Sequence, residues 1–157
     1  METAYIALGS NLPGPAGTPR ETLDAAIDRL AELGHVAARS SYYETEPVGY
    51  ADQPPFLNAA VALETPIDPH TLLDRLLEVE RSFGRDRAQG IPNGPRTLDL
   101  DILLYGDYVM STQALQLPHP RMHQRSFVLV PMAEIASERI HPELHRTMSQ
   151  LWKDLGQ

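Results

Sequence analysis

The sequence predicts an α+β fold, a ferredoxin-like sandwich with an antiparallel sheet, helices on one sheet face and additional C-terminal helices. Two observations lead to this prediction. Short apolar runs typical of strands alternate with two longer stretches in which apolar residues recur every three or four positions, as in amphipathic helices. Their order is β-α-β-β-α-β, followed by helical material. With 157 residues, the chain is expected to form a single domain over residues 1–157.

The first half of the predicted sandwich has clear boundaries. A strand over 3–11 ends in a Gly-Ser-Asn turn. The stretch "TPRE" then predicts a helix start, because Thr18 is a good N-cap and Glu21 closes a capping box. Two further strands are expected over 36–45 and 56–65.

The second half begins at "DP", where Asp68 can cap a helix whose first residue is proline. Glu80 falls on the apolar stripe of this helix, and an acid on an inward face needs a partner. An arginine at the rim and a direct role in the site are both open interpretations. A strand within "GPRTLDLDILLYG" follows, then a short helix over 127–136 and a final helix over 146–155.

Composition narrows the class of protein. Hydrophobic residues make up 42% and charged residues 22% of the chain, as in soluble globular proteins. There are no cysteines, no membrane-length apolar run and no signal-peptide pattern, so we expect a cytoplasmic protein without membrane partners, and a monomer. The net charge of −8 argues against general nucleic-acid binding.

The arginines are concentrated in one region of this acidic chain. Arg81, Arg85, Arg87 and Arg96 lie close in sequence, with Asp86 the single acid between residues 81 and 96. Such a basic island favours a compact anionic ligand such as a nucleotide. A solvated surface patch is the alternative interpretation.

Two aspartates occupy alternate positions of an otherwise apolar strand. Residues two apart in a strand share a face, so Asp99 and Asp101 project together, away from the leucines between and beside them. Adjacent carboxylates repel unless a proton or a cation lies between them. Hard oxygen ligands point to Mg²⁺, and the arginines upstream favour this over two exposed aspartates.

Carboxylate-bound Mg²⁺ beside guanidinium groups is the arrangement that phosphoryl transfer requires. No Walker A or kinase glycine-rich loop occurs in the chain, so a kinase here belongs outside those classes. His119, in "LPHPRMHQRSF", is either a phosphate contact or a bystander among the six histidines of the chain. Phe56 and Phe127 either pack in the core or stack on a flat heterocycle, whose edge Asn58 could then hydrogen-bond.

Four segments together resemble the 6-hydroxymethyl-7,8-dihydropterin pyrophosphokinase family: "AYIALGSNL", "YYETEPVGYADQPPFLNAAVALET", "GPRTLDLDILLYG" and "LPHPRMHQRSFVLVPMAEIA". They span nearly the whole chain, in the family's order. The resemblance implies transfer of pyrophosphate from ATP to the pterin's hydroxymethyl oxygen, releasing AMP, in folate biosynthesis. It also implies a ferredoxin-like fold.

The resemblance further implies roles for individual residues. Asp99 and Asp101 would hold two Mg²⁺ ions, and Arg85 and Arg96 would join them in catalysis. Thr45, Val48, Phe56, Asn58 and Phe127 would bind the pterin. Residues expected to bind or support ATP are Glu80, Arg85, Arg87, Arg96, Ile102, His119 and Arg125.

The sequence departs from the family pattern in three places. Phe56 stands where members often carry tyrosine, which preserves stacking and removes a hydroxyl contact. Glu46 stands where proline is frequent, and we expect a looser pterin-side loop. The stretch "AQGIPN", Ala88–Asn93, lacks basic and aromatic residues that some members place there, which bears on closure over ATP.

Two other functions use the same residues. A two-metal phosphohydrolase would employ the aspartates to activate water. A nucleotide- or metal-sensing module would bind MgATP without turnover. Release of AMP in the presence of the pterin alcohol separates both from the pyrophosphokinase.

Overall fold

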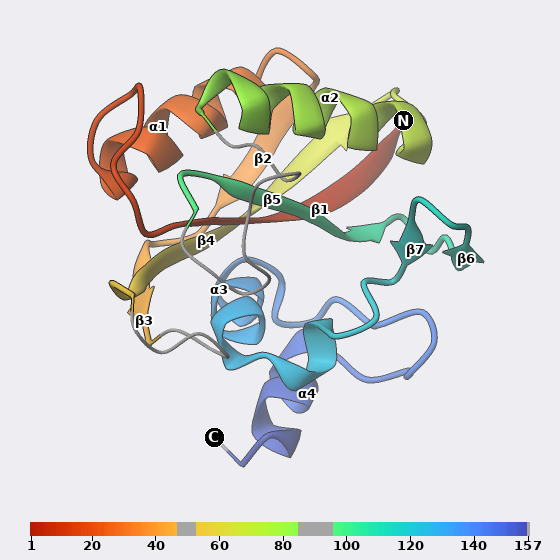
Figure 1. Cartoon of the computed structure of the whole chain (residues 1–157). Helices are drawn as coiled ribbons and strands as arrows, with labels where there is room; N and C mark the ends of the chain where they lie inside the picture. The colour runs from red at the N-terminus through yellow and green to blue at the C-terminus, as the bar shows by residue number, and fades with distance from the viewer. Residues whose placement is uncertain (47–52, 85–95, 157) are drawn as a thin grey trace.

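The computed structural model contains an antiparallel sheet with strand order β2-β4-β1-β5 (Figure 1). β1 (Glu2–Ser10) pairs with β4 (Phe56–Thr65) on one side and β5 (Asp99–Tyr105) on the other, while β2 (His35–Arg39) and β3 (Tyr43–Thr45) both pair with β4. All these pairings are antiparallel, which confirms the predicted ferredoxin-like arrangement. The structure describes residues 1–46, 53–84 and 96–156.

Helices α1 (Pro19–Leu30) and α2 (Pro69–Ser82) cover one face of the sheet (Figure 1). Both begin as predicted: the Thr18 hydroxyl accepts a hydrogen bond from the Glu21 amide, the Glu21 carboxylate accepts one from the Thr18 amide, and Asp68 caps α2. Caps of this kind stabilise a helix by about 1 kcal/mol each. The leucine-rich stripes of both helices form the larger core with β1, β4 and β5.

The opposite face of the sheet is covered by α3 (Ser126–Ala136), which follows the 3-10 turn η1 (Met122–Gln124), and α4 (Met148–Asp154) packs on α3 on the side away from the sheet (Figure 1). Pro131 lies buried within α3, where it leaves one carbonyl of the preceding turn without its usual donor. A second core forms between these helices and the sheet. The C-terminal helices therefore complete a three-layer molecule.

The prediction of one continuous strand over 36–45 was wrong. The chain forms β2 and β3 with an interruption at Ser40, a buried residue. The Ser40 amide donates to the Ala60 carbonyl (2.9 Å), but the Ala60 amide donates to the Ser40 hydroxyl (2.9 Å) instead of to a strand carbonyl. A side chain thus replaces one backbone acceptor of the ladder, which divides the strand.

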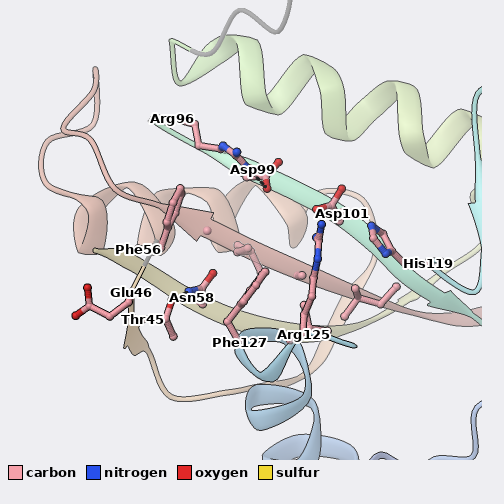
Figure 2. A pocket seen from close by; sticks show the side chains of 15 residues that line it. Thr45, Glu46, Phe56, Asn58, Arg96, Asp99, Asp101, His119, Arg125 and Phe127 are labelled. Atoms are coloured by element: carbon pink, nitrogen blue, oxygen red, sulfur yellow. Dashed lines mark hydrogen bonds and ion pairs between the residues drawn. The ribbon is translucent and has the colours of Figure 1, made fainter. Parts of the chain in front are cut away.

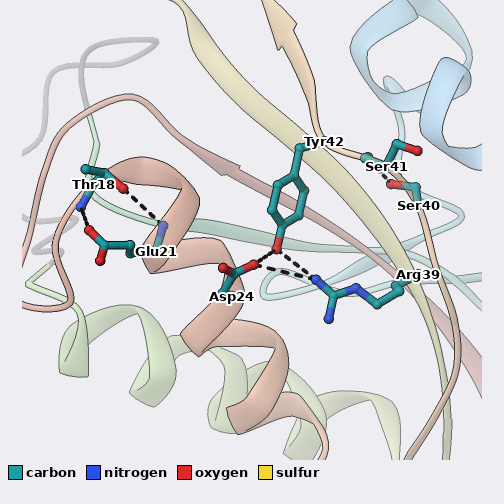
Figure 3. A network of polar contacts seen from close by, with 7 residues as sticks. All are labelled: Thr18, Glu21, Asp24, Arg39, Ser40, Ser41 and Tyr42. Carbon is teal, nitrogen blue, oxygen red and sulfur yellow. Dashed lines mark hydrogen bonds and ion pairs between the residues drawn. The ribbon is translucent and has the colours of Figure 1, made fainter.

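The segment between β2 and β3 is fastened to α1 by a polar network (Figure 3). The Tyr42 hydroxyl donates to Asp24 of α1 and accepts a hydrogen bond from Arg39 (2.9 Å). Burial and this contact with Asp24 raise the pKa of Tyr42 to about 12. The network holds the start of β3 against one side of the sandwich.

The final helix is shorter than the predicted 146–155. Thr147 is its N-cap, and a capping box with Gln150 starts the helix at Met148. Arg146 lies before the cap and pairs with Asp154 instead (2.8 Å). A short hairpin of β6 (Met110–Ser111) and β7 (Gln116–Leu117) has no counterpart in the predicted elements. Within the described residues, no helix is long and apolar enough to span a membrane.

Candidate active site

The alternation expected in β5 is confirmed. Leu100 and Ile102 enter the core beneath α2, while Asp99 and Asp101 project into a pocket on the side of the sheet that carries α3 (Figure 2). After Ile102, β5 contains one extra residue, and its pairing register with β1 shifts between Ile6 and Tyr5. The carboxylates therefore occupy the open end of the sheet face, and α3 covers the rest.

The pocket contains about 760 Å³ of empty space, including its open mouth. Nine residues that the sequence nominated line it together: Thr45, Phe56, Asn58, Arg96, Asp99, Asp101, His119, Arg125 and Phe127. Six further residues complete the lining: Ala7, Leu8, Gly9, Glu46, Leu103 and Val128.

Five nominated residues remain. Val48, Arg85 and Arg87 fall outside the described residues, as does the stretch Ala88–Asn93. Ile102 is buried on the opposite side of β5 from the two aspartates. Glu80 is a buried residue of α2.

Arg96 and Asp99 form a partly shielded ion pair at the pocket wall. The Arg96 Nη1 atom lies 3.1 Å from Asp99 Oδ2, and the two side chains are only 20% and 21% exposed. The Arg96 guanidinium also lies 5.3 Å from the centre of the Phe56 ring, at cation–π distance. One arginine thus connects the carboxylates with the aromatic part of the pocket.

Arg125 supplies a second guanidinium from the residue that precedes α3. Figure 2 shows it extending from the start of that helix toward Asp101. Burial lowers the pKa of Arg125, and the charges of Asp101 and Asp99 act in the opposite direction. The two carboxylates therefore face positive charge from Arg96, just before β5, and from Arg125, just before α3.

His119 is held as a neutral ring. Its amide donates to the Leu103 carbonyl (2.9 Å), and its Nδ1 accepts a hydrogen bond from the Arg121 amide (3.2 Å). Burial, followed by the charge of Arg125, lowers its pKa to about 4. With Nδ1 acting as the acceptor, the proton of the neutral ring is on Nε2, which makes that atom a donor.

This depressed pKa predicts a pH-dependent stability. The unfolded chain binds a proton at His119 below about pH 6.5, whereas the folded chain resists it until about pH 4. We expect the free energy of unfolding to fall by about 2 kcal/mol between pH 7 and pH 5 from this group alone. Denaturant unfolding of the wild type and His119→Asn at both pH values measures the difference, and exposed His35→Asn is the control. Equal losses in all three proteins would contradict the assignment.

The aromatic part of the pocket is built on β3 and β4. Phe56 and Asn58 share a face of β4, as predicted, and the Asn58 side-chain amide donates to the Thr45 hydroxyl (2.5 Å). The Phe127 ring, in the first turn of α3, lies beside Asn58 (Figure 2). Two aromatic rings and an amide edge thus meet at one place, which suits a flat polar heterocycle.

Gly9 forms part of the pocket floor, and sequence reasoning missed it. It pairs with Asn58 of β4 on one side and with Asp99 of β5 on the other. A Cβ at this position would lie 3.1 Å from the Asn58 Oδ1 atom. A glycine inside a strand is the signal that could have identified it, since it marks close approach by another group.

Asn11 is a second residue that sequence reasoning undervalued. The backbone amide of Asn11 donates to the Arg96 carbonyl (3.1 Å), and the side-chain Oδ1 of Asn11 accepts from the backbone amide of Arg96 (2.9 Å). Its Nδ2 donates to Gln53 Oε1 and to the Pro54 carbonyl, both at 2.9 Å. One buried side chain thereby fixes the backbone at Arg96 and at the approach to β4.

Glu80 lies below the aspartates, on the α2 side of the sheet. It is 1% exposed, and its carboxylate accepts a hydrogen bond from the Leu100 amide (2.7 Å). Leu100 is the residue between Asp99 and Asp101, so this bond fixes the strand that carries both. Its described contact is therefore with the backbone of β5.

The donor set fits magnesium. Among the described residues, no group of three or more His, Cys, Asp or Glu side chains is arranged to enclose a metal. The pocket instead offers two carboxylates on one strand face. Magnesium commonly takes one or two protein carboxylates and completes its shell with water and substrate phosphates.

A second groove adjoins the pocket through Asp101 and His119. Leucines of α2 form one wall, and the β6–β7 hairpin forms the other. Its lining residues are Leu73, Leu77, Leu100, Asp101, Ile102, Thr112, Gln113, Ala114, Leu115, Gln116, His119 and Pro120. The mainly apolar walls suit a nucleobase whose phosphates reach the carboxylates.

The fold and the site define an α+β phosphotransferase that lacks a P-loop. Residues 5–137 match the family model for 7,8-dihydro-6-hydroxymethylpterin-pyrophosphokinase. The chain belongs to this family.

Individual relatives agree with the family match. A Haemophilus influenzae 2-amino-4-hydroxy-6-hydroxymethyldihydropteridine pyrophosphokinase is 46% identical over 144 residues, covering 90% of this chain and 86% of the relative. The Bacillus subtilis protein of the same name is 45% identical over 137 residues, covering 86% and 78%. The crystal structure of wild-type Plasmodium falciparum HPPK-DHPS with pteroate superimposes with a TM-score of 0.76 at 15% identity. It covers 98% of this chain and 42% of that longer one, and this likeness concerns the fold.

Proposed function

We propose that the pocket and the adjoining groove carry out the reaction of this family. Pyrophosphate is transferred from ATP to 6-hydroxymethyl-7,8-dihydropterin, giving the pterin pyrophosphate and AMP in folate biosynthesis. The observation that carries this proposal is the position of Asp101, which lines both the aromatic pocket and the apolar groove. The acceptor hydroxyl and the ATP phosphates can therefore meet at the carboxylates.

Asp99 and Asp101 would hold two Mg²⁺ ions. Ions at these carboxylates would be near both the ATP phosphates and the hydroxyl group of the pterin. When bound, magnesium neutralises phosphate charge and lowers the pKa of the acceptor hydroxyl. The chain's own cationic groups stabilise the charge that develops on the transferred group, with Arg96 and Arg125 on two sides of the pocket. The Nε2–H of His119 donates a hydrogen bond to a phosphate oxygen without adding charge.

Arg85 and Arg87 complete the phosphate-binding set in this proposal, and Ile102 lies along the nucleoside groove. Glu80 supports the site through the Leu100 amide. Because the described residues that line the pocket include no evident general base for the pterin hydroxyl, positioning and electrostatic stabilisation account for catalysis in this proposal.

The pterin stacks between Phe56 and Phe127, and Asn58, with Thr45 and Val48, recognises its edge. Asn58 is suited to this role because its side chain is buried and already oriented by the Thr45 hydroxyl. Gly9 beneath it leaves room for close approach of the ring. Glu46 is exposed at the pocket rim. The proposed binding of the pterin requires no contact from this position.

Removal of the Phe127 ring tests the stacking role. Phe127→Ala is expected to weaken pterin binding about tenfold to a hundredfold, in line with 1–3 kcal/mol for one stacked ring. ATP binding should change by less than about twofold, since the groove walls stay intact. Titration calorimetry with each ligand measures both effects. Equal losses for the two ligands would refute stacking.

We further propose that residues 1–157 act as a single pyrophosphokinase domain, as a cytoplasmic monomer. The two cores on either side of one sheet support a single cooperative unit. Sedimentation at assay concentrations measures the oligomeric state directly.

The function is tested by incubating the protein with ATP, Mg²⁺ and the pterin alcohol. AMP and pterin pyrophosphate in equal amounts are the expected products. Inorganic phosphate formed without the pterin would instead identify a phosphohydrolase. Binding of MgATP with no product of either kind would identify a sensing module.

A further inference from the structure

A hydrogen-bonded contact between α3 and β3 lies outside the pocket and joins its two walls. Glu134, near the end of α3, accepts three hydrogen bonds from the segment that leads into β3. Its Oε1 accepts from the Ser41 amide (2.9 Å) and the Tyr43 hydroxyl (2.6 Å), and its Oε2 accepts from the Ser41 hydroxyl (2.9 Å). Glu134 itself does not line the pocket.

On the helix side, this contact is in register with Phe127. Glu134 follows Phe127 by seven residues, so both side chains project from the same face of α3, about 10 Å apart along the axis. Bonds that hold Glu134 against the strand therefore also fix the rotation and axial position of α3. Those two variables decide where the Phe127 ring lies.

On the strand side, the contact acts on the residues that recognise the ring edge. Tyr43 pairs directly with Asn58 of β4, and two residues later Thr45 accepts the Asn58 side-chain bond. The segment is also held on its opposite face, where Tyr42 bonds to Asp24 of α1. Successive residues are thus bonded alternately to α3 and α1, which leaves β3 little freedom to shift.

The electrostatics agree with a specific contact rather than a loose surface pair. The hydrogen bond from Tyr43 lowers the pKa of Glu134 and raises the pKa of Tyr43. A carboxylate that accepts three hydrogen bonds is also geometrically defined, because charge-assisted bonds are short and directional.

We propose that Glu134 is a positioning residue for the pterin: by bonding to Ser41 and Tyr43 it sets the separation between Phe127 and the Asn58–Thr45 edge. This inference rests on the proposed function of the pocket. It assigns to an exposed carboxylate outside the pocket a part in placing one stacking ring relative to the groups that recognise the pterin's edge.

The test compares Tyr43→Phe, Glu134→Gln and the double variant in the full chain. Each single variant is expected to weaken binding of 6-hydroxymethyl-7,8-dihydropterin about tenfold, and the double variant no further, as coupled residues behave. Binding of a non-hydrolysable MgATP analogue should stay within about twofold of the wild type. Pterin fluorescence in the presence of that analogue, and KM values for both substrates, provide the readouts.

Glu138→Gln is the matched control, because Glu138 is an exposed carboxylate just after α3 with no hydrogen-bond partner among the described residues. It should keep wild-type affinity. Unchanged pterin affinity in Tyr43→Phe and Glu134→Gln, with a lowered melting temperature, would show a purely structural contact and overturn the proposal. So would equal weakening of both ligands. If the wild type binds the pterin and forms AMP, the proposed function holds and these outcomes concern Glu134 and Tyr43 alone. If the wild type does neither, the proposed function fails and the inference loses its basis.

Discussion

Replacing Asp101 with alanine is expected to abolish turnover while leaving the fold intact. Asp101 lines both the pocket and the groove, so under the proposed function its loss would remove a magnesium ligand at the place where the two substrates meet. Loss of several kcal/mol of transition-state stabilisation corresponds to a rate reduction of about 10³-fold or more. Asp99→Ala should behave in the same way. AMP formation at saturating Mg²⁺ measures the effect.

The fold should survive because both aspartates project away from the larger core, where Leu100 and Ile102 are packed. Asp28→Ala, at an exposed position of α1, serves as a control for removal of one carboxylate. Thermal unfolding should show similar midpoints for the three variants. Near-normal turnover in Asp99→Ala or Asp101→Ala would refute the assignment of a two-magnesium site to these residues.

Replacing Arg96 with alanine is expected to lower kcat by about 10³-fold, which corresponds to about 4 kcal/mol of transition-state stabilisation. The guanidinium lies at 3.1 Å from Asp99 and close to the Phe56 ring, between the carboxylates and the aromatic wall. It is therefore placed to neutralise charge on a group moving from one side of the pocket to the other. Steady-state kinetics with each substrate varied gives kcat and KM separately.

Arg96→Lys is the matched control, since it keeps the charge and loses the planar fork of donors. It should recover part of the lost kcat. A raised KM with unchanged kcat in Arg96→Ala would mean that the residue only binds substrate. Such a result would move Arg96 from the catalytic set to the binding set.

The position of the site could be read from local sequence patterns. Strand periodicity places Asp99 and Asp101 on one face, and the same rule places Phe56 beside Asn58. Both follow from geometry within a few residues of the chain. The order of elements predicted the sheet topology in the same way, because each strand and helix has strong local signals.

What could not be predicted depends on contacts between distant segments. The bonds of Asn11 to Arg96 and Pro54, and of Glu134 to Tyr43, join residues that no periodicity relates. Ser40 divides a predicted strand because its hydroxyl finds the Ala60 amide, a partner visible only in the folded sheet. Side-chain hydrogen bonds to remote backbone override local propensity at these positions.

The destination of the β-phosphorus of ATP distinguishes pyrophosphoryl transfer from the other reactions that this site could carry out. With ATP labelled at the β-phosphorus, Mg²⁺ and 6-hydroxymethyl-7,8-dihydropterin, we expect the label in the pterin product and the release of unlabelled AMP in equal amount. Asp101→Ala should yield neither product. Label remaining in ADP, or appearing in inorganic phosphate or free pyrophosphate without a modified pterin, would contradict pyrophosphoryl transfer at this site.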